Sequence, residues 1–213
     1  MIVYDVEAFL GKVSTMIESA LNKPEIQNKL ESYNYDLDQL VTGRDLLEEL
    51  IKLQEHFQRE YGRKSKFFEM IKRDQKFAFD TYMRHQKLIY QALKDSPGLK
   101  EALHFNENTA DVAEGWLNQA SVFYKKVGFI VKDFSVYDLD DSELLQSRAM
   151  IEALKDAKIM ERKIQQKAQE AIVQRDKVLN VLQQWVYQFN SIAQIALHDD
   201  LLSLESLGIE LES

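Results

Sequence analysis

The chain has 213 residues, a formal net charge of −8, seven glycines, two prolines and no cysteine. So few turn-forming residues disfavour β-sandwiches and barrels, and the lack of cysteine excludes disulfides and thiolate metal sites. No segment approaches the roughly 18 uncharged apolar residues of a membrane span, because even the longest apolar window, 127–136, contains Lys132 and Asp133. The first residues also lack the basic region and apolar run of a signal peptide. We therefore expect a nearly all-helical cytoplasmic protein.

Two short helices are expected near the amino terminus. Apolar residues recur at helical spacing over 3–23. Pro24 then occupies the first position of a helical segment over 24–30, where proline is tolerated because no helical partner is needed for its nitrogen. The run Tyr33-Asn34-Tyr35 ends this segment.

A long helix is predicted over 37–94. Asp36 and Gln39 have the spacing of a capping box at its start, and a Pro-Gly pair follows its end. The apolar rhythm continues across Gly62. A lone glycine costs a helix about 1 kcal/mol relative to alanine and does not by itself end it.

Three further helices are expected in the second half, over 99–105, 109–127 and 142–197. Asp140 and Glu143 have the spacing of another capping box, at the start of the last of these helices. If that helix is unbroken, its length is about 84 Å at about 1.5 Å per residue. The remaining residues, 199–213, are expected to form an acidic tail.

The predicted fold class is all-α, an elongated up-and-down helical bundle with two long helices. An alternative keeps the helices but folds both long ones back, near Gly62 and around Asp156–Glu161. That alternative gives a compact bundle of six or seven helices.

A weak internal repeat accompanies this pattern. Residues 40–50 align with residues 144–154 at an offset of 104 residues. We therefore predict one domain over 1–213 that contains a duplication. Its pseudo-twofold halves are expected at about 24–95 and 127–199.

Glu101 and His104 form a Glu-x-x-His pair, the unit from which ferritin-like di-iron sites are built. Such a site needs two of these pairs and two further glutamates, and the sequence offers a single pair beside a Pro-Gly turn. A solvated surface histidine explains the pattern as well. These two residues are the candidate metal ligands. No catalytic nucleophile, glycine-rich phosphate loop or cofactor motif is visible, so neither catalytic residues nor a cofactor are predicted.

The segment 59–94 is basic and interleaved with aromatic residues. Within residues 52–100 there are 12 Lys and Arg against 6 Asp and Glu. Single-stranded nucleic acid could bind such a mixture, but most of these aromatics fall at core spacing and the whole chain is acidic. We therefore favour an acidic protein partner or self-association over nucleic acid. Phe77 and Phe79 flank Ala78 and cannot share its direction, so they are expected to cover a neighbouring helix or a dimer interface.

Arg175 and Asp176 interrupt the apolar rhythm of the last long helix. Burying such a pair costs more than it returns unless both groups are fully bonded. The pair is therefore interpreted either as a solvated pair at the edge of the apolar seam or as a register-setting contact between long helices.

Many residues of the chain match a pattern found in other proteins. In the carboxy-terminal third they are Arg175-Asp176, Leu182, Trp185, Phe189, Ile192-Ala193, Ala196-Leu197, Leu204 and Leu207-Gly208. In the first half and the middle they are Tyr33-Asn34-Tyr35, Leu40, Gly43, Glu60-Tyr61-Gly62, Trp116 and Phe123-Tyr124. This set resembles uncharacterised bacterial all-helical proteins of unknown function. The resemblance covers most of the chain and implies a helical architecture and a bacterial source, without an activity, a cofactor or catalytic residues.

The sequence favours a non-enzymatic cytoplasmic interaction or scaffold protein. We expect it to self-associate along its long helices as a homo-oligomer, or to bind a protein partner. The alternative is a ferritin-like metal-binding bundle with Glu101 and His104 among its ligands. A third hypothesis is single-stranded nucleic-acid binding through the basic segment 59–94.

Overall fold

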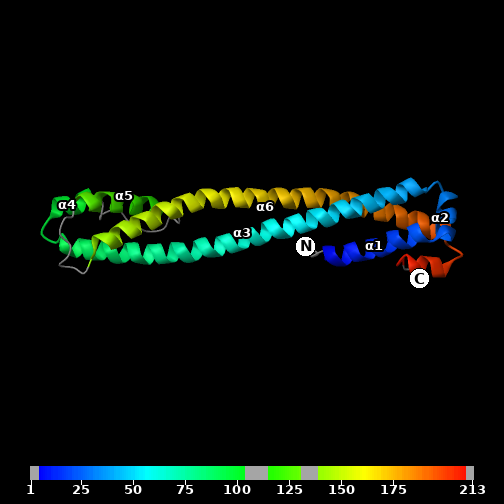
Figure 1. Ribbon diagram of the computed structural model, residues 1–213, viewed down its shortest axis with the longest axis horizontal. Helices are drawn as coiled ribbons and strands as arrows, with labels where there is room; N and C mark the ends of the chain where they lie inside the picture. Colours follow the sequence, from blue (N-terminus) through cyan, green and yellow to red (C-terminus); the bar gives the residue numbers. More distant parts are fainter. Residues whose placement is uncertain (1–4, 104–114, 131–138, 210–213) are drawn as a thin grey trace. The chain divides into compact units, whose positions relative to one another are not determined.

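The computed structural model describes residues 5–103, 115–130 and 139–209, and every element within them is an α-helix (Figure 1). The prediction of an all-α fold with two long helices is therefore confirmed. Among the described helices, none is apolar enough along its length to cross a membrane. The helices are α1 (Val6–Asn22), α2 (Pro24–Glu31), α3 (Leu37–Ala92), α4 (Pro97–Ala102), α5 (Gly115–Ile130), α6 (Asp141–Ala196) and α7 (Leu201–Ser206).

Both long helices, α3 and α6, are uninterrupted over 56 residues. The alternative with fold-backs near Gly62 and around Asp156–Glu161 is therefore wrong. At Gly62 a side chain would meet no neighbouring atom within 4 Å, so this glycine occupies an open position on a continuous helix. At the second place, Lys158 and Glu161 form an ion pair of 2.8 Å one turn apart, which supports the helix.

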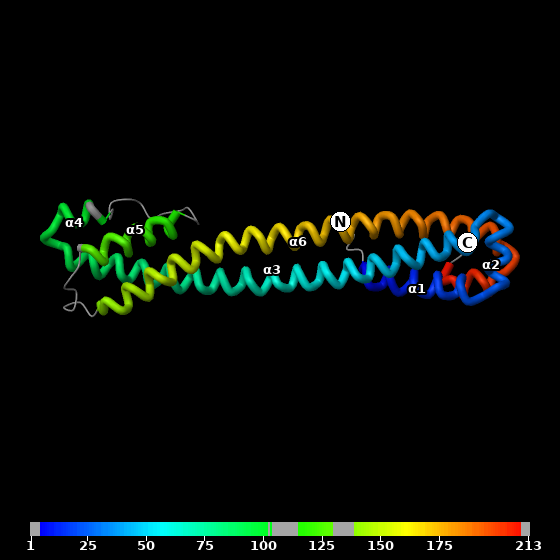
Figure 2. Tube along the Cα trace, turned by 45° about the horizontal axis from the view of Figure 1, so that its top comes forward, coloured from blue at the N-terminus to red at the C-terminus, as the bar shows by residue number. Residues whose placement is uncertain are grey.

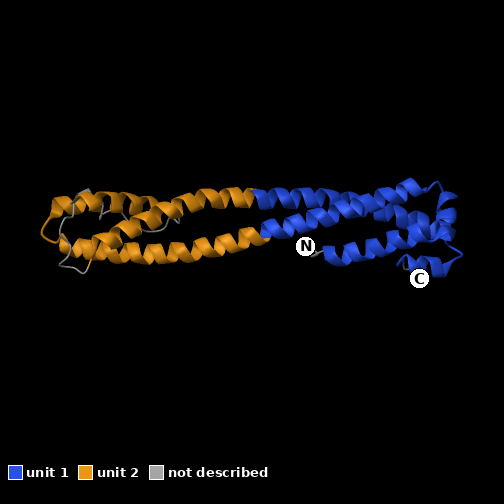
Figure 3. Cartoon of the chain, in the orientation of Figure 1, with its two compact units in different colours: residues 1–61, 167–213 blue, residues 62–166 orange. Residues whose placement is uncertain are grey.

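The chain divides into two compact units, residues 1–61 with 167–213 (unit 1) and residues 62–166 (unit 2), shown in Figure 3. Within each unit α3 and α6 lie side by side (Figure 2). Because both long helices run through both units, this division does not test the prediction of a single domain.

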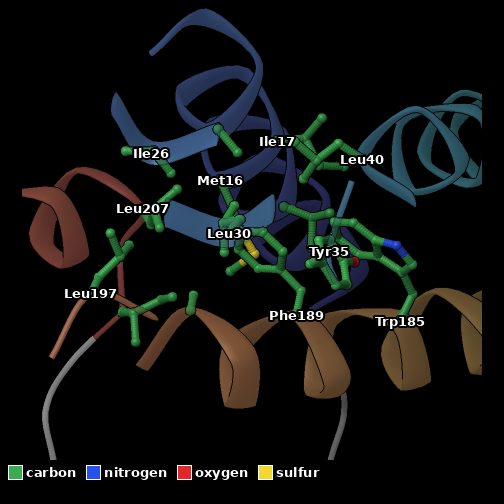
Figure 4. Packing of buried hydrophobic residues seen from close by; sticks show 14 of the residues in the cluster. Met16, Ile17, Ile26, Leu30, Tyr35, Leu40, Trp185, Phe189, Leu197 and Leu207 are labelled. Carbon is green, nitrogen blue, oxygen red and sulfur yellow. The ribbon is translucent and has the colours of Figure 1, made fainter. Parts of the chain in front are cut away.

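The core of unit 1 gathers residues of α1, α2, α6 and α7 around the start of α3 (Figure 4). The Trp185 and Phe189 rings of α6 stack with centroids 5.3 Å apart, and Tyr35 meets Phe189 edge-on. The indole nitrogen of Trp185 donates to the carbonyl of Gln39, 3.0 Å away. A Cβ built on Gly43 would overlap the indole ring, so this position requires glycine for the close approach of α6.

Residues expected to form an acidic tail contribute to this core. After α6 the chain turns into α7, and Leu204, Leu207 and Ile209 are buried against the unit. The acidic residues Asp199 and Asp200 at the turn each lie 3.3 Å from the ammonium group of Lys29. The composition of 199–213 is acidic as expected, but its first part is anchored by leucines that sit among the acids.

Unit 2 packs α5 against the second part of α3 and the first part of α6. Tyr82 lies at its centre, with the Phe123 ring of α5 edge-on at 5.3 Å. Trp116 contacts Phe79 near the start of α5, and Tyr124 contacts His85, which is six residues further along α3. α5 therefore runs parallel to this part of α3.

The helix starts confirm half of each predicted capping box. Asp36 accepts a hydrogen bond of 3.1 Å from the backbone of Gln39, but the side-chain amide of Gln39 donates to the Asn34 carbonyl. Asp140 accepts from the backbone of Ser142 at 3.2 Å. The carboxylate of Glu143, expected to complete the second box, is bonded to side chains of α3 instead.

The two long helices have the same length, and one sequence offset relates both of their ends. Leu37 and Asp141 begin them 104 residues apart, and Ala92 and Ala196 end them at the same spacing. The six-residue helices α4 and α7 also begin and end 104 residues apart. The duplication itself stays a prediction, and these bounds are consistent with it.

Candidate functional site

The candidate metal ligands are not brought together by the described part of the chain. Glu101 is exposed on α4, and His104 lies outside the described residues. Among the residues that the structure places, no three histidines and carboxylates converge in a way that could hold a metal ion.

The two phenylalanines that flank Ala78 point to opposite sides of α3. Ala78 itself is fully buried. The Phe79 ring packs edge-on against Trp116 of α5, with centroids 5.2 Å apart, and so covers a neighbouring helix as expected. Phe77 is 65% exposed and faces away from α5. One side of α3 is therefore closed by α5, whereas the other keeps an aromatic ring in solvent.

Phe77 lines an apolar groove between α3 and α6 within unit 2, which we call the α3–α6 groove. The groove has a volume of about 440 Å³. It is lined by Met70, Ile71, Arg73, Asp74, Phe77, Met150, Ala153, Leu154 and Ala157, none of which belongs to α5. Its polar members, Arg73 and Asp74, form an ion pair of 3.1 Å, so the remaining wall is hydrophobic.

The shape of the groove follows from unequal side chains on its two walls. On α6, the small residues Ala153 and Ala157 are one turn apart and stand beside the larger Met150 and Leu154. On α3, Met70 and Phe77 stand two turns apart, and both are largely exposed. Large apolar side chains of α3 beside the small residues of α6, with no helix over them in the described part of unit 2, leave a depression able to accept the side chains of another helix.

Further along α3, a polar network joins α3, α5 and α6 of unit 2. His85 of α3 is completely buried. Its Nδ1 lies 3.0 Å from the hydroxyl of Tyr124 on α5, and its Nε2 lies 3.0 Å from the Glu143 carboxylate on α6. Arg84 donates a hydrogen bond to the same carboxylate. Ser147, one turn beyond Glu143, is hydrogen-bonded to Tyr124.

Burial keeps two members of this network, His85 and Tyr124, neutral. Removal from water, together with the charge of Arg84, lowers the pKa of His85 from 6.5 to about 4. Burial also raises the pKa of the Tyr124 hydroxyl above its ordinary value, so this group remains a phenol. With a proton on Nε2, the neutral imidazole donates to Glu143 and accepts from Tyr124, which satisfies both ring nitrogens. The network thus links α3, α5 and α6 through hydrogen bonds.

A second polar contact attaches α5 to α6. The Ser121 hydroxyl donates to the Glu152 carboxylate over 2.6 Å. This bond, helped by the charges of Lys155 and Lys125, holds the pKa of Glu152 below its usual range. Glu152 is therefore ionised at neutral pH, and α5 is held to α6 independently of His85.

Arg175 and Asp176 lie within unit 1. The Arg175 guanidinium sits over the Phe57 ring, 4.2 Å from its centroid, and donates to Asp176 over 2.8 Å. The arginine is mostly buried, whereas the aspartate side chain is 47% exposed. The pair is thus bonded at the edge of the apolar seam, with the arginine stacked on an aromatic face.

Sequence reasoning missed the His85 network and the open side of α3. His85 continues the buried spacing of Ala78, Tyr82 and Ile89, and this rhythm was a signal that the histidine is internal. The role of Glu143 in the network was not recognised, because its spacing from Asp140 fits a capping box. Nothing local shows that the two residues meet, because they are 58 residues apart.

A scan against protein-family models, a search of curated proteins and a search of solved structures each return no match. The family resemblance and the bacterial source therefore stay predictions, and the functional argument depends on the geometry of the chain.

Proposed function

We propose that this protein is a non-enzymatic helical interaction protein that binds a partner helix in the α3–α6 groove. The observation that carries the proposal is the exposed apolar wall formed by Met70 and Phe77 opposite the small residues of α6. Contiguous exposed apolar surface of this kind is typical of sites for protein partners. Helices bind such grooves by inserting residues spaced three, four and seven positions apart.

The contacts within unit 2 weigh against the two competing functions. Phe79 and Tyr82 are engaged with Trp116, so these aromatics of the basic segment are not free to stack on nucleobases. A ferritin-like centre needs inward carboxylates and histidines from several helices. In the described interior of unit 2, His85 and Glu143 bond to each other and to Tyr124 and Arg84, an arrangement that ties helices together.

The proposal is tested by replacing Phe77 with the photoreactive benzoylphenylalanine in the native cell. Irradiation is expected to join it to a different protein, with the cross-link mapped by mass spectrometry to an amphipathic helix. Tyr187 carries the same probe as a control, because it is 75% exposed on α6 in unit 1, outside the groove. The adduct should disappear when Ala153→Glu places a charge in the groove. Equal cross-linking from both positions, or none from Phe77, contradicts the proposal.

A further inference from the structure

The α3–α6 groove lies in the most basic part of the chain. Residues 62–77 contain six Lys and Arg against two Asp and Glu, although the whole chain has a net charge of −8. The facing stretch of α6, residues 150–163, has four basic residues against three acidic ones and does not offset this excess. A ligand that enters the groove therefore meets a positive field.

The positive charge follows the open side of α3. Lys66, Arg73 and Arg84 are separated by seven and eleven residues, which places them on one stripe of the helix. Phe77 is four residues from Arg73 and seven from Arg84, so it belongs to the same stripe. All three cations are exposed. Asp80 lies on the same stripe, Arg84 is paired with Glu143 and Arg73 with Asp74, so the excess positive charge beside Phe77 comes from Lys66 and the other lysines and arginines of 62–77.

A second copy of the chain fits this surface poorly. A symmetric dimer would bring the same patch of both copies together, and the two basic stripes would repel each other. The described part of the acidic end of another copy, residues 199–209, is folded onto its own unit 1. Its Asp199 and Asp200 are held by Lys29, and its Leu204 is buried in the core of unit 1.

We infer that the occupant of the α3–α6 groove is an acidic amphipathic helix of a different protein. The inference rests on the proposed function and specifies its partner. Apolar anchors of that helix lie against Phe77 and above the small residues Ala153 and Ala157, while its carboxylates face Lys66 and Arg73. The basic stripe from Lys66 to Arg84 spans about 27 Å at about 1.5 Å per residue, so an occupant of about 18 residues follows it from end to end.

The test uses three fluorescent 18-residue peptides that share one leucine pattern at helical spacing. Their polar positions are glutamate in the first, glutamine in the second and lysine in the third. Fluorescence anisotropy with the full chain is expected to show the acidic peptide binding at least about tenfold more tightly than the neutral one, with no binding of the basic peptide. The affinity of the acidic peptide should fall as salt is raised, because screening weakens its attraction to exposed cations.

Two double variants separate charge at the groove from net charge. Lys66→Gln with Arg73→Gln is expected to weaken binding of the acidic peptide about tenfold and leave the neutral peptide unchanged. Lys12→Gln with Lys52→Gln removes the same charge from exposed positions in unit 1 and should change neither affinity. Circular dichroism confirms that both variants remain helical.

The outcomes distinguish the inference from the proposed function. If the neutral peptide binds as tightly as the acidic one, the acidic partner is wrong and the groove remains a helix site. If no peptide binds, the inference is overturned, and cross-linking at Phe77 decides the proposed function separately. If ultracentrifugation shows a dimer that Phe77→Asp dissociates, the occupant is a second copy and the inference is again overturned.

Discussion

Units 1 and 2 close the same pair of helices in chemically different ways. In unit 1, Phe189 of α6 stacks on Trp185 and packs over the start of α3, where Gly43 gives the indole room. At the position 104 residues earlier, unit 2 has His85, which bonds to Tyr124 and Glu143. Unit 2 has aromatic contacts of its own around Tyr82, and it adds a hydrogen-bond network around a buried histidine that the stack of unit 1 lacks. Protonation of His85 makes the network of unit 2 sensitive to pH.

The open face of unit 2 has no matching composition in unit 1. Ala153 and Ala157 of the α3–α6 groove correspond, at the offset of 104 residues, to Glu49 and Leu53. Larger side chains therefore occupy the equivalent positions of unit 1. The difference teaches that two helical frameworks of equal helix lengths can differ in one wall by the size of a few side chains.

The largest change in the free energy of unfolding is expected when a ring is removed from the aromatic stack of unit 1. Phe189→Ala should lower the free energy of unfolding by about 3–5 kcal/mol, because a fully buried ring is lost and a cavity remains. Urea unfolding followed by Trp185 fluorescence, with Trp116→Phe as background, measures unit 1 alone. Val181→Ala, an exposed position on the same helix, should change stability by less than about 0.5 kcal/mol. Similar losses in both variants would show that the stack does not hold the unit.

The polar closure of unit 2 is expected to weaken in acid. The folded chain keeps His85 neutral down to a pKa of about 4, whereas the unfolded chain takes up this proton near pH 6.5. The unfolded state therefore binds more protons between these values, and stability falls as the pH is lowered, by up to about 3 kcal/mol. Unfolding is followed at pH 7 and pH 5 by Trp116 fluorescence, with Trp185→Phe as background.

A matched variant isolates the contribution of His85 to this pH dependence. Every other titrating group is retained in His85→Gln, so the difference between the two slopes belongs to the histidine. The variant should lose less stability between pH 7 and pH 5 than the parent chain. Equal losses would mean that protonation of His85 does not control the stability of unit 2.

Replacing either of two glycines of α3 with alanine should change the free energy of unfolding, with opposite signs at the two positions. Gly43→Ala is expected to destabilise unit 1 by about 1–3 kcal/mol, because the added methyl group overlaps the Trp185 ring. Gly62→Ala should stabilise the chain by about 0.5–1 kcal/mol, because its side chain enters open space on a continuous helix. Thermal unfolding of the two variants measures whether each substitution raises or lowers stability. A loss at Gly62 equal to that at Gly43 would contradict an uninterrupted α3.

The smallest effect on stability is expected where the effect on binding is greatest. Phe77→Ser removes a largely exposed ring and should change the free energy of unfolding by less than about 0.5 kcal/mol. Phe79→Ser, two residues along, removes a ring packed on Trp116 and should destabilise unit 2 by clearly more. Chemical denaturation distinguishes the two variants. The comparison fails if Phe77→Ser is as destabilising as Phe79→Ser.

Much of the helical framework could be predicted from the sequence because its signals are local. Pro24 begins α2 as expected, and Asp36 and Asp140 cap the long helices through backbone bonds two or three residues away. The continuity of α3 across Gly62 follows from the small cost of one glycine. Each of these features depends on residues within about one helical turn, and so the chain carries them without knowledge of its neighbours.

The candidate site could be predicted only in part. The positions of Phe77 and Phe79 on opposite sides of Ala78 follow from helical spacing alone. Which of the two rings is covered depends on α5, whose Trp116 is 37 residues away from Phe79 along the chain. The contact between His85 and Glu143 is equally non-local. From its local spacing alone, Glu143 is interpreted as part of a capping box.

The sequence by itself determined the all-α class, the two long helices and the apolar face of each, because backbone hydrogen bonding and helical periodicity act over a few residues. Only the tertiary structure decided which face is buried, which histidine is kept neutral and which groove is left open. Burial and pKa depend on the atoms that packing brings near a group, and here those atoms come from helices distant along the chain.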